Sequence, residues 1–168
     1  MTAHFLPTLV LALVLVAVPV RARDDKRSRA TLKGLEGVLV VVEGFSADNG
    51  RAGFSEEPFK TAAELKLRLA GIKVSTKEER AASPGKPYLY VHVNTLATEP
   101  NRGEPFSINL QMHQTVHLVR NVEFATATTW SKGITGNGDA DFVLETFKGL
   151  MNRFLNAWLS VNPRENAR

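Results

Sequence analysis

The sequence contains no cysteine, and this absence excludes several kinds of site. Without a thiol the chain has no disulfide, no thiolate-bound metal, no cysteine nucleophile and no lipid attached through cysteine. Its stability must therefore come from a hydrophobic core. A chain of 168 residues can build that core as one domain, because a domain of about 150 residues buries roughly 68–70% of its unfolded surface.

Concentrated positive charge is also scarce. The net charge is +4 at pH 7, and the basic cluster at residues 21–29 is partly offset by Asp24 and Asp25. Elsewhere Lys and Arg are mixed with Asp and Glu, as on an ordinary solvated surface. A nucleic-acid-binding surface gathers Lys and Arg on one face with aromatic side chains between them. We therefore expect no nucleic-acid partner.

The N-terminus carries an uninterrupted apolar run, Leu9 to Val18. Its length is typical of the hydrophobic region of a signal peptide and too short to span a bilayer, which takes about 17–25 residues. Pro19 follows the run, and Val20 and Ala22 suit the −3 and −1 positions of a cleavage site. The sequence thus predicts a signal peptide over residues 1–22, cleavage after Ala22, and export to the periplasm or the medium.

Two features of this segment oppose cleavage and export. No Lys or Arg precedes the apolar run, and the first basic residues follow it, against the positive-inside rule. The alternatives are an N-terminal anchor that is retained or a wrongly assigned start codon. A retained anchor is the single route by which we expect the chain to meet a membrane.

The mature chain is predicted to begin with a flexible charged leader, residues 23–31, and to continue as a single α+β domain, residues 32–163, with a short tail at 164–168. Val38 to Val42 is apolar on both faces, which is typical of a buried central strand. Further strands are predicted at 72–74, 87–98, 106–118 and 123–131, with one or two helical turns at 76–82. Residues 133–138, rich in glycine, are predicted as a loop.

Two long amphipathic helices are predicted. The first has Ser55 as N-cap and Gly71 as its left-handed stop, and the second runs from about residue 140 to 161 after the capping residue Asp139. Their apolar faces are Phe59, Ala62, Ala63, Leu65, Leu69 and Ala70 in the first helix, and Val143, Phe147, Leu150, Met151, Phe154, Trp158 and Val161 in the second. The order β-α-β-β-β-β-α predicts a two-layer α+β sandwich, with both helices on one face of a mostly antiparallel sheet.

The last predicted strand carries two large aromatic residues, Phe124 and Trp130. They lie six residues apart, so a regular strand places them on the same face. Burial of each is worth roughly 1.5–3 kcal/mol or more, much more than burial of the alternate set of Ala and Thr side chains. We therefore predict that both are buried against the final helix.

Three segments, LRLAGIKV (67–74), PYLYVHVNTL (87–96) and ATTW with a glycine three residues on (127–133), resemble small exported bacterial proteins of uncharacterised function. The resemblance covers about residues 32–163. Its motifs are structural: a helix stop, a strand and a strand corner. It implies export and this fold, and it supplies no activity.

No motif in the sequence assembles a catalytic or cofactor site. The glycine-rich residues 133–138 are followed by Asp139 and not by the Lys of a phosphate loop. Ser46 and Ser55 each follow a Gly-Phe pair, but neither is followed by the second glycine of a nucleophile elbow. His92, His113 and His117 are predicted on one sheet face, but His113 and His117 lie about 13 Å apart on one strand. We therefore predict no cofactor and no metal, and the sequence favours a non-catalytic role over enzyme activity.

The remaining candidate is a polar, aromatic sheet face. Alternation along two strands places the following residues together on the solvent side: Tyr88, Tyr90, His92, Asn94, Gln111 and His113. A hairpin centred near Arg102 would set His113 opposite Tyr90. Tyrosines of this kind are enriched at protein interfaces, although they also occur as simple sheet packing.

Two functions follow from the sequence as hypotheses. The first is an exported, non-catalytic binding or assembly module that uses this face or a free sheet edge. Its partner would be an envelope or secreted protein, or a second copy of the chain. The second is a small hydrolase or ligand-binding protein with a pocket between the 133–138 loop and the segment from Ser46 to Phe54.

Overall fold

The computed structural model describes residues 24–44, 54–96 and 103–163. The predicted signal peptide, its cleavage site after Ala22 and the tail at 164–168 lie outside the described residues. None of the helices in the described part combines the length and hydrophobicity needed to cross a membrane.

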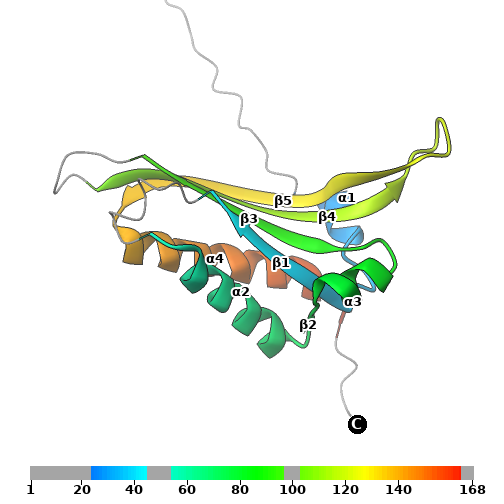
Figure 1. Ribbon diagram of the computed structural model, residues 1–168, viewed down its shortest axis with the longest axis horizontal. Coiled ribbons are helices and arrows are strands. Elements are labelled where there is room, and N and C mark those ends of the chain that lie inside the picture. Colours follow the sequence, from blue (N-terminus) through cyan, green and yellow to red (C-terminus); the bar gives the residue numbers. More distant parts are fainter. Residues whose placement is uncertain (1–23, 45–53, 97–102, 164–168) are drawn as a thin grey trace, which may run out of the picture.

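A five-stranded sheet forms one layer of the fold, and two long helices form the other (Figure 1). The strand order is β2-β1-β3-β4-β5, with β1 parallel to both of its neighbours and the longer β3–β4 and β4–β5 ladders antiparallel. The predicted two-layer α+β sandwich is confirmed. The strands are β1 (Gly37–Glu43), β2 (Lys73–Val74), β3 (Tyr88–Thr95), β4 (Glu104–His117) and β5 (Phe124–Gly138), and the helices are α1 (Lys26–Ala30), α2 (Glu56–Ala70), α3 (Lys77–Ala82) and α4 (Ala140–Leu159).

The core lies between the sheet and the pair α2 and α4. Alternate residues of β1, β3 and β4 point into it, as the two-residue period of a strand requires. Phe59 of α2 and Phe147 of α4 meet there, with their ring centroids 5.3 Å apart. The predicted stripe of α4 is confirmed from Val143 to Phe154, and Trp158 packs at the core's edge while its indole N–H donates to the Leu35 carbonyl (3.0 Å).

The apolar face predicted for α2 is partly wrong. Leu65 and Leu69 are 54% and 74% exposed, whereas Leu67, which was not assigned to the core, is fully buried. The buried residues Phe59, Ala63, Leu67 and Ala70 follow each other at intervals of four, four and three, so they form a narrow stripe along one side of the helix. The predicted stop at Gly71 is confirmed by its φ of 85° and by the hydrogen bond from Ile72 N–H to the Leu67 carbonyl (2.9 Å).

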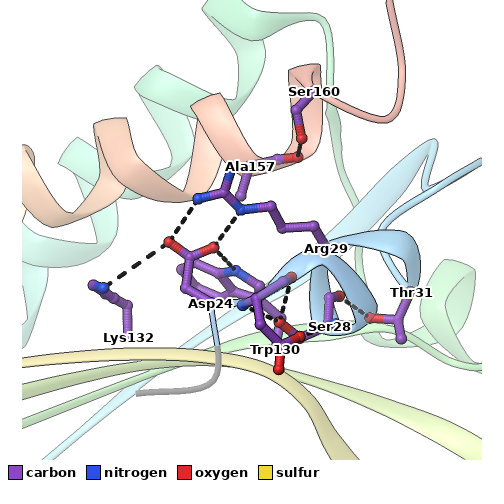
Figure 2. A network of polar contacts seen from close by, with 9 residues as sticks. Asp24, Ser28, Arg29, Thr31, Trp130, Lys132, Ala157 and Ser160 are labelled. Carbon is purple, nitrogen blue, oxygen red and sulfur yellow. Dashed lines mark hydrogen bonds and ion pairs between the residues drawn. The ribbon is translucent and has the colours of Figure 1, made fainter. Parts of the chain in front are cut away.

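The prediction that residues 23–31 form a flexible charged leader is wrong for the described part of this segment, which begins at residue 24. Residues 26–30 form α1, which Asp25 and Ser28 cap reciprocally. The Asp24 carboxylate accepts hydrogen bonds from Arg29 Nε (2.7 Å) and from the indole of Trp130 (3.1 Å), and Lys132 lies 4.0 Å away (Figure 2). The hydrogen bond from Arg29 is the main reason that the pKa of Asp24 is lowered, against the effect of burial. The charges of this segment were evident from the sequence, whereas the cap formed by Asp25 and Ser28 and the contact of Asp24 with Trp130 were not predicted.

The glycine-rich residues 133–138, predicted as a loop, are instead the second half of β5. They pair with β4 in continuous register from Asn109↔Gly133 to Glu104↔Gly138. Backbone pairing needs no side chain, and at the glycine positions of this segment a side chain would collide with its neighbours. A Cβ at Gly136 would lie 2.7 Å from the ring of Phe106, so this glycine allows close packing of β4 on β5.

A β-bulge separates the two aromatic residues of β5. Met112 pairs with Trp130 and the next residue, His113, pairs with Thr128, so Thr129 is the extra residue. The bulge reverses the alternation along β5. Trp130 is fully buried, as predicted, but Phe124 is 74% exposed beside His117, so the prediction for Phe124 is wrong.

Candidate functional site on the open face of the sheet

The side of the sheet opposite α2 and α4 (Figure 1) is here called the open face. Alternation with the buried residues of β3 and β4 places on it the six residues that the sequence singled out. Tyr88 and Tyr90 are half-buried there, and their side chains alternate with the core residues Leu89 and Val91. The ladder between β3 and β4 brings the two strands of the site into one row. The pairs on this face are Tyr88↔His113, Tyr90↔Gln111, His92↔Asn109 and Asn94↔Ser107.

The rings of this face pack against one another. Tyr88 and His113 are stacked, with centroids 4.8 Å apart and planes at 11°, and Tyr90 meets the same imidazole edge-on at 5.7 Å. Tyr90 and His92 stack at 5.9 Å. His113 therefore lies opposite Tyr88 and not opposite Tyr90 as a turn near Arg102 would require. The pairing Thr95↔Phe106 centres the connection one residue earlier along the chain.

Two further residues belong to this site and were not predicted from the sequence. Arg80 of α3 lies over the ring of Tyr88, with its guanidinium carbon 4.6 Å from the ring centroid, a cation–π contact. Glu43 at the end of β1 accepts a hydrogen bond from the Tyr90 hydroxyl (2.8 Å). That hydrogen bond, followed by burial, raises the pKa of Tyr90. Glu43 lies 47 residues from Tyr90, and for Arg80 the one signal in the sequence was the cap of α3 at Thr76 and Glu79.

Hydrogen bonds hold the remaining polar side chains of the face. His113 Nε2 pairs with Gln111 Oε1 (3.0 Å), and Asn94 Nδ2 lies 3.4 Å from His92 Nδ1. Burial lowers the pKa of His113 below its usual value of 6.5. At neutral pH the imidazole is therefore uncharged, which suits its place between two tyrosine rings.

The stability of the protein should depend on pH through His113. Because its pKa is lower in the folded than in the unfolded chain, its contribution is complete above about pH 6.5 and is lost as the pH falls towards the lowered value. The urea concentration at the unfolding midpoint should fall between pH 7.5 and 5.5 in the wild type, and it should fall less in His113→Gln. His117→Gln, at an exposed position four residues further along β4, is the matched control. Equal pH dependence in wild type and His113→Gln would refute this assignment.

The described residues do not support the pocket proposed for a hydrolase. Its first wall, the 133–138 loop, is the strand β5, and residues 45–53 of its second wall lie outside the described part of the chain. Within residues 24–44, 54–96 and 103–163, no three His, Asp or Glu side chains gather closely enough to hold a metal ion. Elsewhere among the described residues, a groove of about 480 Å³ lies between α2 and α4, and another of about 690 Å³ runs along β1 and α2.

No protein-family model matches the chain, and no curated protein matches it significantly. Among solved structures, a PelC dodecamer from Paraburkholderia phytofirmans is similar at 16% identity and a TM-score of 0.46, over 75% of this chain and 90% of that one. A minor lipoprotein from Acinetobacter baumannii is similar at 9% identity and a TM-score of 0.34, over 76% and 94% of the two chains.

Proposed function

We propose that the protein is an exported, non-catalytic binding module whose open face holds another protein of the envelope or the medium. Export is supported by the apolar run Leu9 to Val18 and by the cleavage pattern that ends at Ala22. The same proposal is in keeping with the resemblance to small exported bacterial proteins, which implies no activity.

One observation carries the binding role: the aromatic row of Tyr88, His113, Tyr90 and His92 is packed in advance. Each ring is held by a neighbouring ring, and the row is flanked by Arg80 over Tyr88 and by Glu43 on the Tyr90 hydroxyl. Rigid tyrosines supply a large contact area at low entropic cost, because little side-chain freedom remains to be lost on binding. The face is also amphipathic, with apolar rings and polar edges, as interface cores are.

The charges at the two ends of the row favour a protein partner over an apolar ligand. Arg80 lies over Tyr88 at one end of the row, and Glu43 pairs with His92 at the other end and accepts the hydrogen bond from Tyr90, so one end is basic and the other acidic. A partner that presents an acidic and a basic group about an apolar centre would match both ends.

The test compares variants of this face. A tagged chain is purified from the envelope fraction of its host, its bound protein is identified, and the dissociation constant of the purified pair is measured by calorimetry. Tyr90→Ala should weaken binding by about tenfold or more, as interface tyrosines do. Leu69→Ala, on the exposed side of α2 beyond the core, is the control and should leave the dissociation constant unchanged. Wild-type affinity in both Tyr88→Ala and Tyr90→Ala would exclude this face as the binding site.

A further inference from the structure

Among the described residues, the strand β1 has no backbone partner on one edge over most of its length. On its β2 side, β1 is paired only at Gly37 and Val38, and beyond Val38 no strand among the described residues pairs with it there. Ser75 N–H donates to the Val38 carbonyl on that side (2.8 Å), whereas Leu39 N–H donates to the Pro87 carbonyl on the β3 side (3.4 Å). Because these directions alternate, Val40 and Val42 direct their N–H and C=O groups to the free edge.

The composition of β1 does not suit an edge strand. Val38 to Val42 is apolar on both faces, a composition that predicts a central strand. Its core-facing residues Val40 and Val42 are buried. Edge strands usually carry charges, proline or bulges that prevent further pairing. The residues of β1 from Leu39 to Val42 have none of these. A further strand beside β1 would give it the position that its sequence predicts.

A groove of about 690 Å³ runs along this edge, and α2 forms its wall. The helix lines the groove with one residue per turn and alternating charge: Glu56, Lys60, Glu64 and Arg68. This order is complementary to itself in an antiparallel arrangement. Two copies of α2 related by a twofold axis would set Lys60 opposite Glu64 and Glu56 opposite Arg68, and the same two contacts would then occur twice.

We propose that two copies of this chain associate through their β1 edges into a symmetric dimer. An antiparallel pair centred on Val41 uses the free stretch from Leu39 to Glu43, and Val40 of one copy exchanges two backbone hydrogen bonds with Val42 of the other. The symmetric pair adds two more, so the interface contains four backbone hydrogen bonds. Within each copy β2 ends at the residue opposite Val38, outside this stretch.

The dimer has a consequence for binding. The twofold axis of such an antiparallel pair stands perpendicular to the sheet, so the two sheets become continuous and both open faces lie on the same side. The two rows of tyrosine and histidine then form one bivalent surface. The dimer itself does not depend on the proposed function, because its interface is formed by backbone groups of β1 and by charges of α2; Glu43, which accepts the hydrogen bond from Tyr90, borders both surfaces.

The test uses the self-complementary charges of α2. Sedimentation equilibrium of the purified protein should give twice the mass of one chain. Lys60→Glu places a second carboxylate against Glu64 of the other copy, and Glu64→Lys places a second ammonium group against Lys60 of the other copy. Each variant alone should therefore dimerise about tenfold or more weakly. An equimolar mixture of the two variants should recover the dimer, because both contacts between unlike copies are again of opposite charge.

Several outcomes would overturn the proposal. They are a wild-type monomer at about 100 μM, dimers that persist in both single variants, and a mixture that stays monomeric although circular dichroism shows both chains folded. Thr61→Lys, on the exposed surface of α2 but outside the groove lining, is the matched control and should dimerise like the wild type. Because the measurement uses no partner protein, its result is independent of the binding test.

Discussion

Trp130→Ala is expected to lower the free energy of unfolding by about 3–5 kcal/mol. The indole is fully buried and meets the ring of Phe154 edge-on, with centroids 5.2 Å apart. Its N–H donates to the Asp24 carboxylate, so the variant also removes a partner that helps to hold α1 on β5. Urea unfolding followed by circular dichroism measures the loss.

Phe124→Ala is the matched control for Trp130→Ala. Both residues are large aromatics of the same strand, and a regular strand would bury them together. In the structure Phe124 is 74% exposed and contacts the ring of His117, so its replacement should change stability by less than about 0.5 kcal/mol. Comparable losses in the two variants would mean that the bulge at Thr129 is absent in solution.

Phe154→Asp is expected to cost more than about 3 kcal/mol, and it should leave little folded protein. The ring of Phe154 is fully buried in the core, where it packs against Trp130. The replacement removes the aromatic contacts and places a carboxylate among apolar side chains, where desolvation opposes its charge. Thermal unfolding and urea titration should both show the loss.

Asn152→Asp tests the opposite face of the same helix. Asn152 is exposed, and its side-chain oxygen accepts a hydrogen bond from Lys66 Nζ (2.7 Å). An aspartate keeps the acceptor and adds a charge beside that ammonium group, so stability should change by less than about 0.5 kcal/mol. A large loss at Asn152, or a small one at Phe154, would contradict the orientation of α4.

Part of the open face could be predicted from the alternation of side chains along the strands. Tyr88, Tyr90 and His92 share a face because side chains alternate along β3, and that much follows from the sequence. The partners of the two tyrosines do not follow from it. Glu43 lies 47 residues from Tyr90, and Arg80 reaches Tyr88 because α3 is placed at the end of the sheet.

The sequence by itself determined the two-layer fold, the stripe of α4 and the helix stop at Gly71. Each of these depends on a period of two or 3.6 residues, or on a local backbone preference, which neighbouring residues express without help from the rest of the chain.

Tertiary structure decided two other features, the strand at residues 133–138 and the separation of Phe124 from Trp130, and it contributed to a third, the order in residues 24–31, where Asp25 and Ser28 also cap α1 locally. Each of these features involves a contact with a segment that is distant in sequence. The Asp24 carboxylate is held by Trp130, the glycines of β5 are paired by β4, and one extra residue at Thr129 lets Trp130 reach the core while Phe124 stays in solvent. Local propensity favours a loop at residues 133–138, and the backbone hydrogen bonds to β4 outweigh it.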